Sequence, residues 1–190
     1  MIDLRKVFAN VQEFEGDVFV ADYTQQTNSA RGVEIAGMPF GDIASFHLYN
    51  DGHLPLWAVN FEANKAFVPD GVSNCECMMR VKNVEKGWWL LCELKYCLDK
   101  NIGVNADTAY AQLVDTWQLL VDKKVINKRR SHAYLNISVP DYSNRAPFVS
   151  FYSTQDEQIR WRKQNKIHLL GHNDVLVINA GILNVPQVTV

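Results

Sequence analysis

Several common signatures of function are missing from this sequence of 190 residues. It contains no glycine-rich phosphate loop, no G-x-S-x-G elbow, and no H-x-H or H-E-x-x-H pattern among its five histidines. A P-loop nucleotide site, a serine hydrolase of the elbow type and a histidine metal centre are therefore not predicted. No apolar run approaches about 18 residues and no basic-then-apolar leader pattern is visible. We expect a cytoplasmic protein that does not associate with membranes.

An excess of basic residues is also lacking. Lysine and arginine number 19 against 21 aspartate and glutamate, which gives a net charge of −2. Such a chain has no general affinity for polyanions, so we do not expect it to coat nucleic acid nonspecifically. Local cationic clusters could still hold phosphates, although such runs are also typical of a solvated helix face. The clusters are residues 123–124, residues 128–130, and residues 160–163 with Lys166.

Paired C-x-x-C knuckles, the usual signature of structural zinc sites, are absent. The four cysteines instead form C-x-C followed by C-x-x-x-x-C, at Cys75, Cys77, Cys92 and Cys97. This spacing does not favour a zinc site. We interpret these residues as reduced, largely buried cysteines that act as small hydrophobic side chains.

Hydrophobic residues make up 47% of the chain, which is enough for a full core at this length. No internal repeat or low-complexity linker interrupts the sequence. We therefore expect one domain over residues 1–190.

Charged residues interrupt one very apolar segment, residues 88–96 (WWLLCELKY). Its composition predicts a central strand covered on both faces. Side chains two apart point to the same face of a strand, so Glu93 and Lys95 project together. Each charge would cost several kcal/mol to bury unless it were paired, hydrogen-bonded or bound to a cation.

A second acidic residue precedes this strand. Residues 75–81 alternate as a strand in which Glu76 has apolar neighbours, and the polar, glycine-terminated residues 82–87 suit a hairpin connection. Pairing across that hairpin could bring Glu76 near Glu93. Two carboxylates offer the oxygen ligands that Mg²⁺ and Mn²⁺ prefer. A buried structural ion pair between Glu93 and Lys95 or Glu76 would account for the same residues.

An acidic residue on one strand, followed by acid-x-Lys on the next, resembles the PD-(D/E)xK nuclease superfamily, also called restriction-endonuclease-like. Glu93-Leu94-Lys95 matches the second half of that motif. The first half is Glu76, with Asp70 of Pro69-Asp70-Gly71 as the second choice. The resemblance implies an α/β fold with a restriction-endonuclease-like core, in which helices flank a mixed central sheet.

The family also has a helix with glutamine and leucine after the acid-x-Lys strand, and then another strand. Apolar residues recur at helical spacing from Asn105, a possible N-cap, to about Lys124, and this segment contains Gln112-Leu113. Residues 131–139 alternate as the following strand. The resemblance thus spans roughly residues 61–140, and it implies that Gln112 orients the substrate phosphate or the attacking water.

The function implied by the resemblance is a Mg²⁺- or Mn²⁺-dependent nuclease, with DNA a better substrate candidate than RNA. The implied catalytic residues are Glu76, Glu93, Lys95 and Gln112, and the implied metal ligands are Glu76 and Glu93, with Asp70 as the alternative. Lys95 would assist the water and the transition state. The alternative function is a catalytically inactive nuclease-like scaffold that serves as an interaction or regulatory subunit. Either form could act as a homodimer or beside a partner protein.

The remaining segments give coarser predictions. Residues 4–14 have helical periodicity with Asp3 as a possible N-cap, and nuclease-like domains often begin with a helix that adds an acid, here Glu13, Glu15 or Glu34. Residues 37–55 are rich in turns and favour a packed loop. The other expected elements are strands over residues 18–21, 174–178 and 182–188, and a basic helix over residues 155–165.

Overall fold

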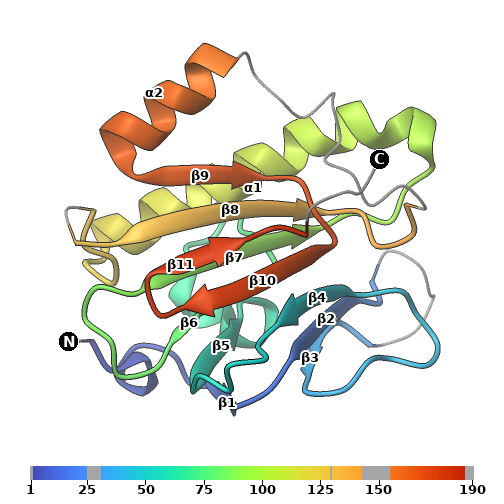
Figure 1. The fold of residues 1–190 in the computed structure, drawn as a ribbon. Helices are drawn as coiled ribbons and strands as arrows, with labels where there is room; N and C mark the ends of the chain where they lie inside the picture. The colour runs from blue at the N-terminus through green and yellow to red at the C-terminus, as the bar shows by residue number, and fades with distance from the viewer. Residues whose placement is uncertain (1, 25–30, 129, 143–154, 187–190) are drawn as a thin grey trace.

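The computed structural model describes residues 2–24, 31–128, 130–142 and 155–186 (Figure 1). Within these residues the chain is a mixed α/β protein whose strands form two sheets. The larger sheet contains, in spatial order, β1 (Gln12–Phe14), β5 (Leu56–Asn60), β6 (Cys77–Val81), β7 (Trp88–Leu94), β8 (His132–Ser138) and β9 (Ile167–Leu170). The smaller sheet contains β11 (Ile182–Asn184), β10 (Asp174–Asn179), β4 (Phe46–Tyr49), β2 (Val18–Asp22) and β3 (Val33–Ala36).

Two α-helices and three short 3₁₀ helices complete the described elements. They are α1 (Ile102–Asp122), α2 (Gln155–Asn165), η1 (Leu4–Lys6), η2 (Glu62–Phe67) and η3 (Asp99–Asn101). None of the helices in the described ranges has both the length and the apolar character that a bilayer crossing requires.

The larger sheet combines an antiparallel and a parallel half. β5, β6 and β7 are antiparallel neighbours, whereas β8 runs parallel to β7, and β9 parallel to β8. A parallel neighbour requires a crossover connection, which here is the helix α1. The expected mixed central sheet is therefore present, and so is the expected hairpin between β6 and β7.

Alternate residues of β7 serve two different cores. Trp89 and Leu91 belong to the core under α1, whereas Trp88 and Leu90 belong to the core shared with the smaller sheet. The apolar content of residues 88–94 follows from this double coverage, because both faces of the strand are buried. The molecule thus has three layers, with α1 behind the larger sheet and the smaller sheet in front of it (Figure 1).

We expected helices to flank the central sheet, but among the described residues no helix covers the face of the larger sheet opposite α1. A second sheet covers that face, and one of its strands, β4, lies inside the turn-rich segment that we expected to be a packed loop. Phe46 and Leu48 of β4 are fully buried, and the strand is paired on both sides, by β2 and by β10. With four residues, β4 is too short for periodicity alone to distinguish it from a loop.

The helix predicted over residues 4–14 is wrong. Asp3 does cap a helical turn, since its Oδ1 accepts the backbone N–H of Arg5 at 3.1 Å, but that turn ends at Lys6. The backbone of Asn10 is held by Asn64, and the following residues pair with β5 as β1. Tertiary hydrogen bonds have overridden the helical periodicity, although Leu4 and Phe8 still reach the core.

Other predicted elements agree with the structure apart from their ends, although residues 187–188 of the strand expected over residues 182–188 lie outside the described residues. α1 begins at Ile102 with Asn101 as its N-cap, and Asn105 lies inside the helix. β6 begins at Cys77, so Glu76 immediately precedes the strand. All four cysteines are free thiols, and three of them, Cys75, Cys77 and Cys92, are buried as expected.

Truncation of Leu91 tests the core under α1. This side chain is fully buried, so Leu91→Ala should lower the free energy of unfolding by about 2–5 kcal/mol through lost burial and an unfilled cavity. Leu98→Ala is the matched control, because Leu98 is 67% exposed and its truncation should change stability by less than about 0.5 kcal/mol. Urea unfolding followed by tryptophan fluorescence measures both. Equal effects of the two variants would contradict the assigned layers.

Candidate functional site

The register of β6 and β7 aligns the two glutamates. Cys77 pairs with Cys92, and the pairing continues along the hairpin to Arg80 and Trp89. Extending this antiparallel register by one residue places Glu76 opposite Glu93. The side chains of directly opposed residues lie on the same face of a sheet, so both carboxyls belong to the α1 side.

A backbone contact ties the two strands together at this point. Oε2 of Glu76 accepts the N–H of Leu94 at 2.9 Å. Glu93 is fully buried, whereas Glu76 is only partly buried and stays within reach of solvent. The pair is therefore a carboxyl cluster at the rim of the core, with one member inside and one at the edge.

Lys95 provides the positive charge of the cluster. Its Nζ donates to Oε1 of Glu93 at 2.5 Å and to Oε1 of Gln112 at 3.0 Å. The backbone N–H of Lys95 donates to the carbonyl oxygen of Ser138 at 2.8 Å, which holds this end of the chain against β8. The structure therefore brings together Glu76, Glu93, Lys95 and Gln112, the four residues that the sequence singled out.

The helix α1 fixes the fourth member of this group. Nε2 of Gln112 donates to the carbonyl oxygen of Asn74 at 3.2 Å. One turn later, the hydroxyl of Thr116 accepts the N–H of Cys75 at 2.8 Å and donates to the carbonyl oxygen of Gln112 at 2.7 Å. The segment that leads into Glu76 is thus fastened to the helix at two successive residues.

Asn74 and Thr116 were not singled out by the sequence as site residues. Asn74 acts through its backbone carbonyl, which leaves no side-chain pattern in a sequence. Thr116 did leave a signal, because residues four apart share one face of a helix, and Thr116 lies four residues after Gln112.

The electrostatics of the cluster centre on Glu76. Burial raises the pKa of this carboxyl well above its ordinary value of 4.5, and the neighbouring Glu93 raises that pKa further by hydrogen bonding and by charge repulsion. The ammonium of Lys95 and the N–H of Leu94 act in the opposite direction. Because its pKa is raised, Glu76 holds a proton to a higher pH than an ordinary glutamate does.

One oxygen of Glu93 lacks a hydrogen-bond donor when both carboxyls are ionised. Lys95 donates a hydrogen bond to Oε1 of Glu93, whereas Oε2 is buried and accepts no hydrogen bond from the described residues. A buried carboxylate oxygen without a donor is costly, so it favours a proton on Glu76 or a cation between the two carboxyls. Mg²⁺ fits this donor set, since it is usually held by one or two carboxylates and completes its shell with water or substrate phosphate.

A larger metal cluster is not found in the described part of the chain. No group of three or more histidine, cysteine, aspartate or glutamate residues is arranged there to hold an ion. The alternative first acid, Asp70, lies in an exposed turn where Gly71 has a φ of 78°, and no hydrogen bond or ion pair of the described residues connects Asp70 to the cluster.

In the described part of the structure, the three acidic residues proposed near the N-terminus do not join the carboxyl cluster. Glu13 accepts the indole N–H of Trp57 at 3.0 Å and pairs with Lys82 at 2.5 Å. Glu34 forms an ion pair with Arg31 at 2.8 Å, and Glu15 is exposed after β1. None of the contacts recorded for these three acids within the described residues involves the cluster.

None of the hydrogen bonds and ion pairs recorded for the described residues of the basic clusters involves the carboxyl pair, and Arg129 lies outside the described residues. Lys123 donates to the carbonyl oxygen of Phe67 at 2.7 Å, and Lys128 contacts Gln118 at 3.4 Å on the surface at the end of α1. Arg160 and Arg162 are exposed on α2, which agrees with the solvated-face interpretation.

Comparisons of this chain with protein-family models, with curated proteins and with solved structures found no match. The functional assignment therefore depends on the geometry of the site and on the order of the elements that build it.

The raised pKa of Glu76 predicts a dependence of stability on pH. The folded protein holds this proton more tightly than the unfolded chain, so the contribution of Glu76 to stability is present at acidic pH and is lost as the pH rises above 4.5 toward the folded-state pKa. The free energy of unfolding of the parent, compared with Glu76→Gln, should fall by up to about 1.4 kcal/mol per pH unit in that window.

Urea unfolding at a series of pH values measures this difference. Glu15→Gln is the matched control, because Glu15 is exposed and lies outside the cluster. A difference between parent and Glu76→Gln that stays constant from pH 4 to pH 9 would refute the shared-proton description.

Proposed function

We propose that this protein is a Mg²⁺- or Mn²⁺-dependent phosphodiester hydrolase of the restriction-endonuclease-like type, acting on nucleic acid and on DNA in preference to RNA. The observation that carries the proposal is the buried Glu93 carboxylate, with Oε2 lacking a donor, between Glu76 and Lys95. Two carboxyls and an ammonium are the groups that a hard cation and a phosphodiester need.

The order of the elements supports the same family. The resemblance requires an acid at one strand, acid-x-Lys at the next, a helix with glutamine, and then another strand. β6, β7, α1 and β8 follow in that order, and β8 is parallel to β7. Each motif residue lies on or beside the element that the resemblance assigns to it, since Glu76 immediately precedes β6 and Gln112 lies in α1.

Each residue of the cluster would have a separate role. Glu76 and Glu93 would hold the cation, and Asp70, which is exposed and outside the cluster, is not needed for the proposal. The bound cation would polarise the phosphate and lower the pKa of a water molecule. The ammonium of Lys95 would stabilise negative charge on the phosphate as the water attacks. Gln112 accepts a hydrogen bond from Lys95 and so fixes the position of the ammonium.

A second candidate is a noncatalytic scaffold of the same type, which would act as an interaction or regulatory subunit with a partner protein or a second copy. One observation favours it. Lys95 already neutralises Glu93 at 2.5 Å, and only two carboxylates meet in this part of the described structure. In that case the cluster is a buried ion pair whose proton remains on Glu76.

Metal titration separates the two candidates. Isothermal calorimetry with Mn²⁺ should detect one site in the parent, and Glu93→Gln should weaken binding by at least about tenfold, because it removes one of two charged ligands. Glu15→Gln, an exposed acid after β1, should bind as the parent does. Absence of Mn²⁺ binding by the folded parent would favour the scaffold and end the catalytic proposal.

Cleavage assays test the catalytic role directly. The parent with Mg²⁺ or Mn²⁺ should cleave at least one of single-stranded, duplex and branched DNA, and Lys95→Ala should be about 100-fold slower or worse, since it removes a charge placed for the transition state. Lys100→Ala is the matched control, because Lys100 is an exposed lysine of η3, and it should cleave at the parent rate. Equal rates in the parent and Lys95→Ala would contradict the assigned chemistry.

A further inference from the structure

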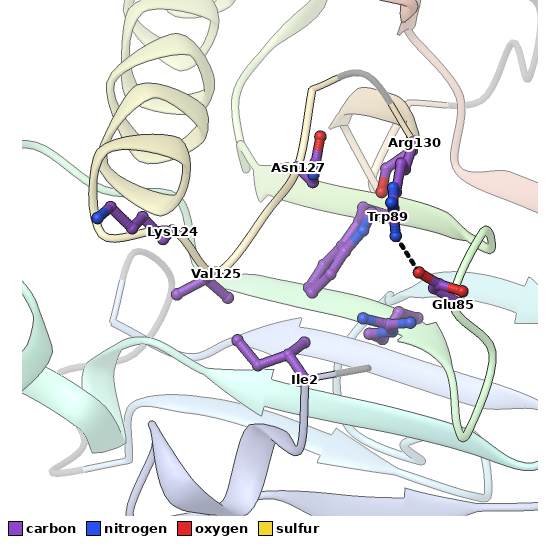
Figure 2. A pocket seen from close by; sticks show the side chains of 9 residues that line it. Ile2, Glu85, Trp89, Lys124, Val125, Asn127 and Arg130 are labelled. Atoms are coloured by element: carbon purple, nitrogen blue, oxygen red, sulfur yellow. Dashed lines mark hydrogen bonds and ion pairs between the residues drawn. The ribbon is translucent and has the colours of Figure 1, made fainter.

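A small cationic pocket lies at the start of β7, beneath the connection from α1 to β8 (Figure 2). Its volume is about 180 Å³. In Figure 2 the ring of Trp89 lies between Ile2 and Val125 on one side and Arg130 with Glu85 on the other. Arg80, Lys124, Asn127 and Ser131 also line the pocket.

Arg80 is the buried charge of this pocket. The residue is 2% exposed, and its guanidinium lies over the ring of Trp89 at 4.2 Å from the ring centroid. It donates to the carbonyl oxygens of Val81, at 3.2 Å, and Val84. Burial lowers the pKa of Arg80 to about 10, so it remains a cation at neutral pH. No ion pair among the described residues includes Arg80, so none of their carboxylates compensates its charge.

The rest of the lining adds to this positive charge. Lys124 and Arg130 supply two further cations, whereas Glu85 is the one carboxylate among the described lining residues. Glu85 forms an ion pair with Arg130 at the mouth, as the dashed line in Figure 2 shows. Both of these side chains are more than half exposed, so their pairing is weak and readily exchanged for another anion. The lining therefore carries a net formal charge of +2 in a chain whose net charge is −2.

Backbone hydrogen bonds hold one wall of the pocket in place. Lys124 has a φ of 60°, and its N–H donates to the carbonyl oxygen of Val121 at 2.9 Å. The N–H groups of Arg130 and Ser131 both donate to the carbonyl oxygen of Asn127, at 3.0 and 3.2 Å. These backbone hydrogen bonds order the wall, so binding needs little reordering of the backbone.

We propose that this pocket binds a phosphate dianion, either free or as the phosphate group of a small monoester. A phosphate monoester carries about −1.5 to −2 charges at pH 7, which complements the excess of cations in the lining. At about 180 Å³ the pocket is below the range of roughly 300–1,000 Å³ for drug-sized ligands. It suits an anion or a small head group rather than a whole dinucleotide.

This anion site is separate from the carboxyl cluster. Arg80 and Trp89 lie four residues from Glu76 and Glu93 along the same strands, which corresponds to about 13 Å. Met78 and Leu91, both fully buried, lie between the two ends of this sheet face. The pocket is therefore closed off from the cluster by core, and its function does not depend on the proposed hydrolase.

Titration with inorganic phosphate by isothermal calorimetry at constant ionic strength tests the site. Because Arg80 is part of the buried hairpin, the variants change its exposed neighbours, and each should keep the fold. The folded parent should bind one phosphate per chain, and Lys124→Gln should weaken binding about tenfold through loss of one charge-assisted contact. Glu85→Gln should tighten binding severalfold, because it removes the competing carboxylate. Lys6→Gln, at an exposed lysine outside the pocket, should match the parent.

Parallel titrations identify the chemical form of the ligand. Tighter binding of ribose 5-phosphate than of inorganic phosphate would assign a monoester, and equal binding would assign the free ion. Acetate bound as tightly as phosphate would overturn the assignment of a dianion. No saturable phosphate binding by the folded parent, or the same affinity in the parent, Lys124→Gln and Glu85→Gln, would refute the site itself.

Discussion

Two opposed carboxyl groups beneath α1 need hydrogen-bond donors and positive charge, and the rest of the site is arranged around that need. Glu93 is fully buried and Glu76 lies opposite it, so two negative charges cannot both persist there without compensation. The N–H of Leu94 donates a hydrogen bond to Glu76, and the ammonium of Lys95 donates one to Oε1 of Glu93. What remains is Oε2 of Glu93, which needs a proton from Glu76 or a cation. A hard cation could take the place of this proton without moving the strands. The proposed chemistry depends on that exchange.

The α1 face of β6 and β7 carries opposite charges at its two ends. Carboxyls gather at one end and Arg80 is buried at the other, with Met78 and Leu91 between them in the core under α1. The helix and the connection that follows it build both ends, since Gln112 fixes the cluster and Lys124 lines the pocket. One helix packed on one sheet face, together with the connection that follows it, thus contacts both a carboxyl cluster and a cationic pocket, which the apolar middle keeps apart.

The site was more predictable from the sequence than the architecture around it. Charges within an otherwise apolar strand are conspicuous, and strand periodicity together with a short hairpin was enough to bring Glu76, Glu93 and Lys95 together. Gln112 came from the resemblance, and helical periodicity agreed with its position. The second sheet was missed because short strands such as β3 and β4 become recognisable only through their partners. The helix expected over residues 4–14 failed because Asn64 and β5 compete for the same backbone. Arg80 gave no signal, since burial of an arginine depends on the neighbouring strand.

The central claim is that the Glu76 and Glu93 carboxyls share either a proton or a hard cation. Carbon-13 NMR of the labelled glutamate carboxyls, followed against pH with and without Mg²⁺, tests it most directly. We expect a raised apparent pKa for the pair in the absence of metal, and a fall of at least about one unit when Mg²⁺ competes with the proton. A pair whose titration is the same with and without Mg²⁺ would contradict the account.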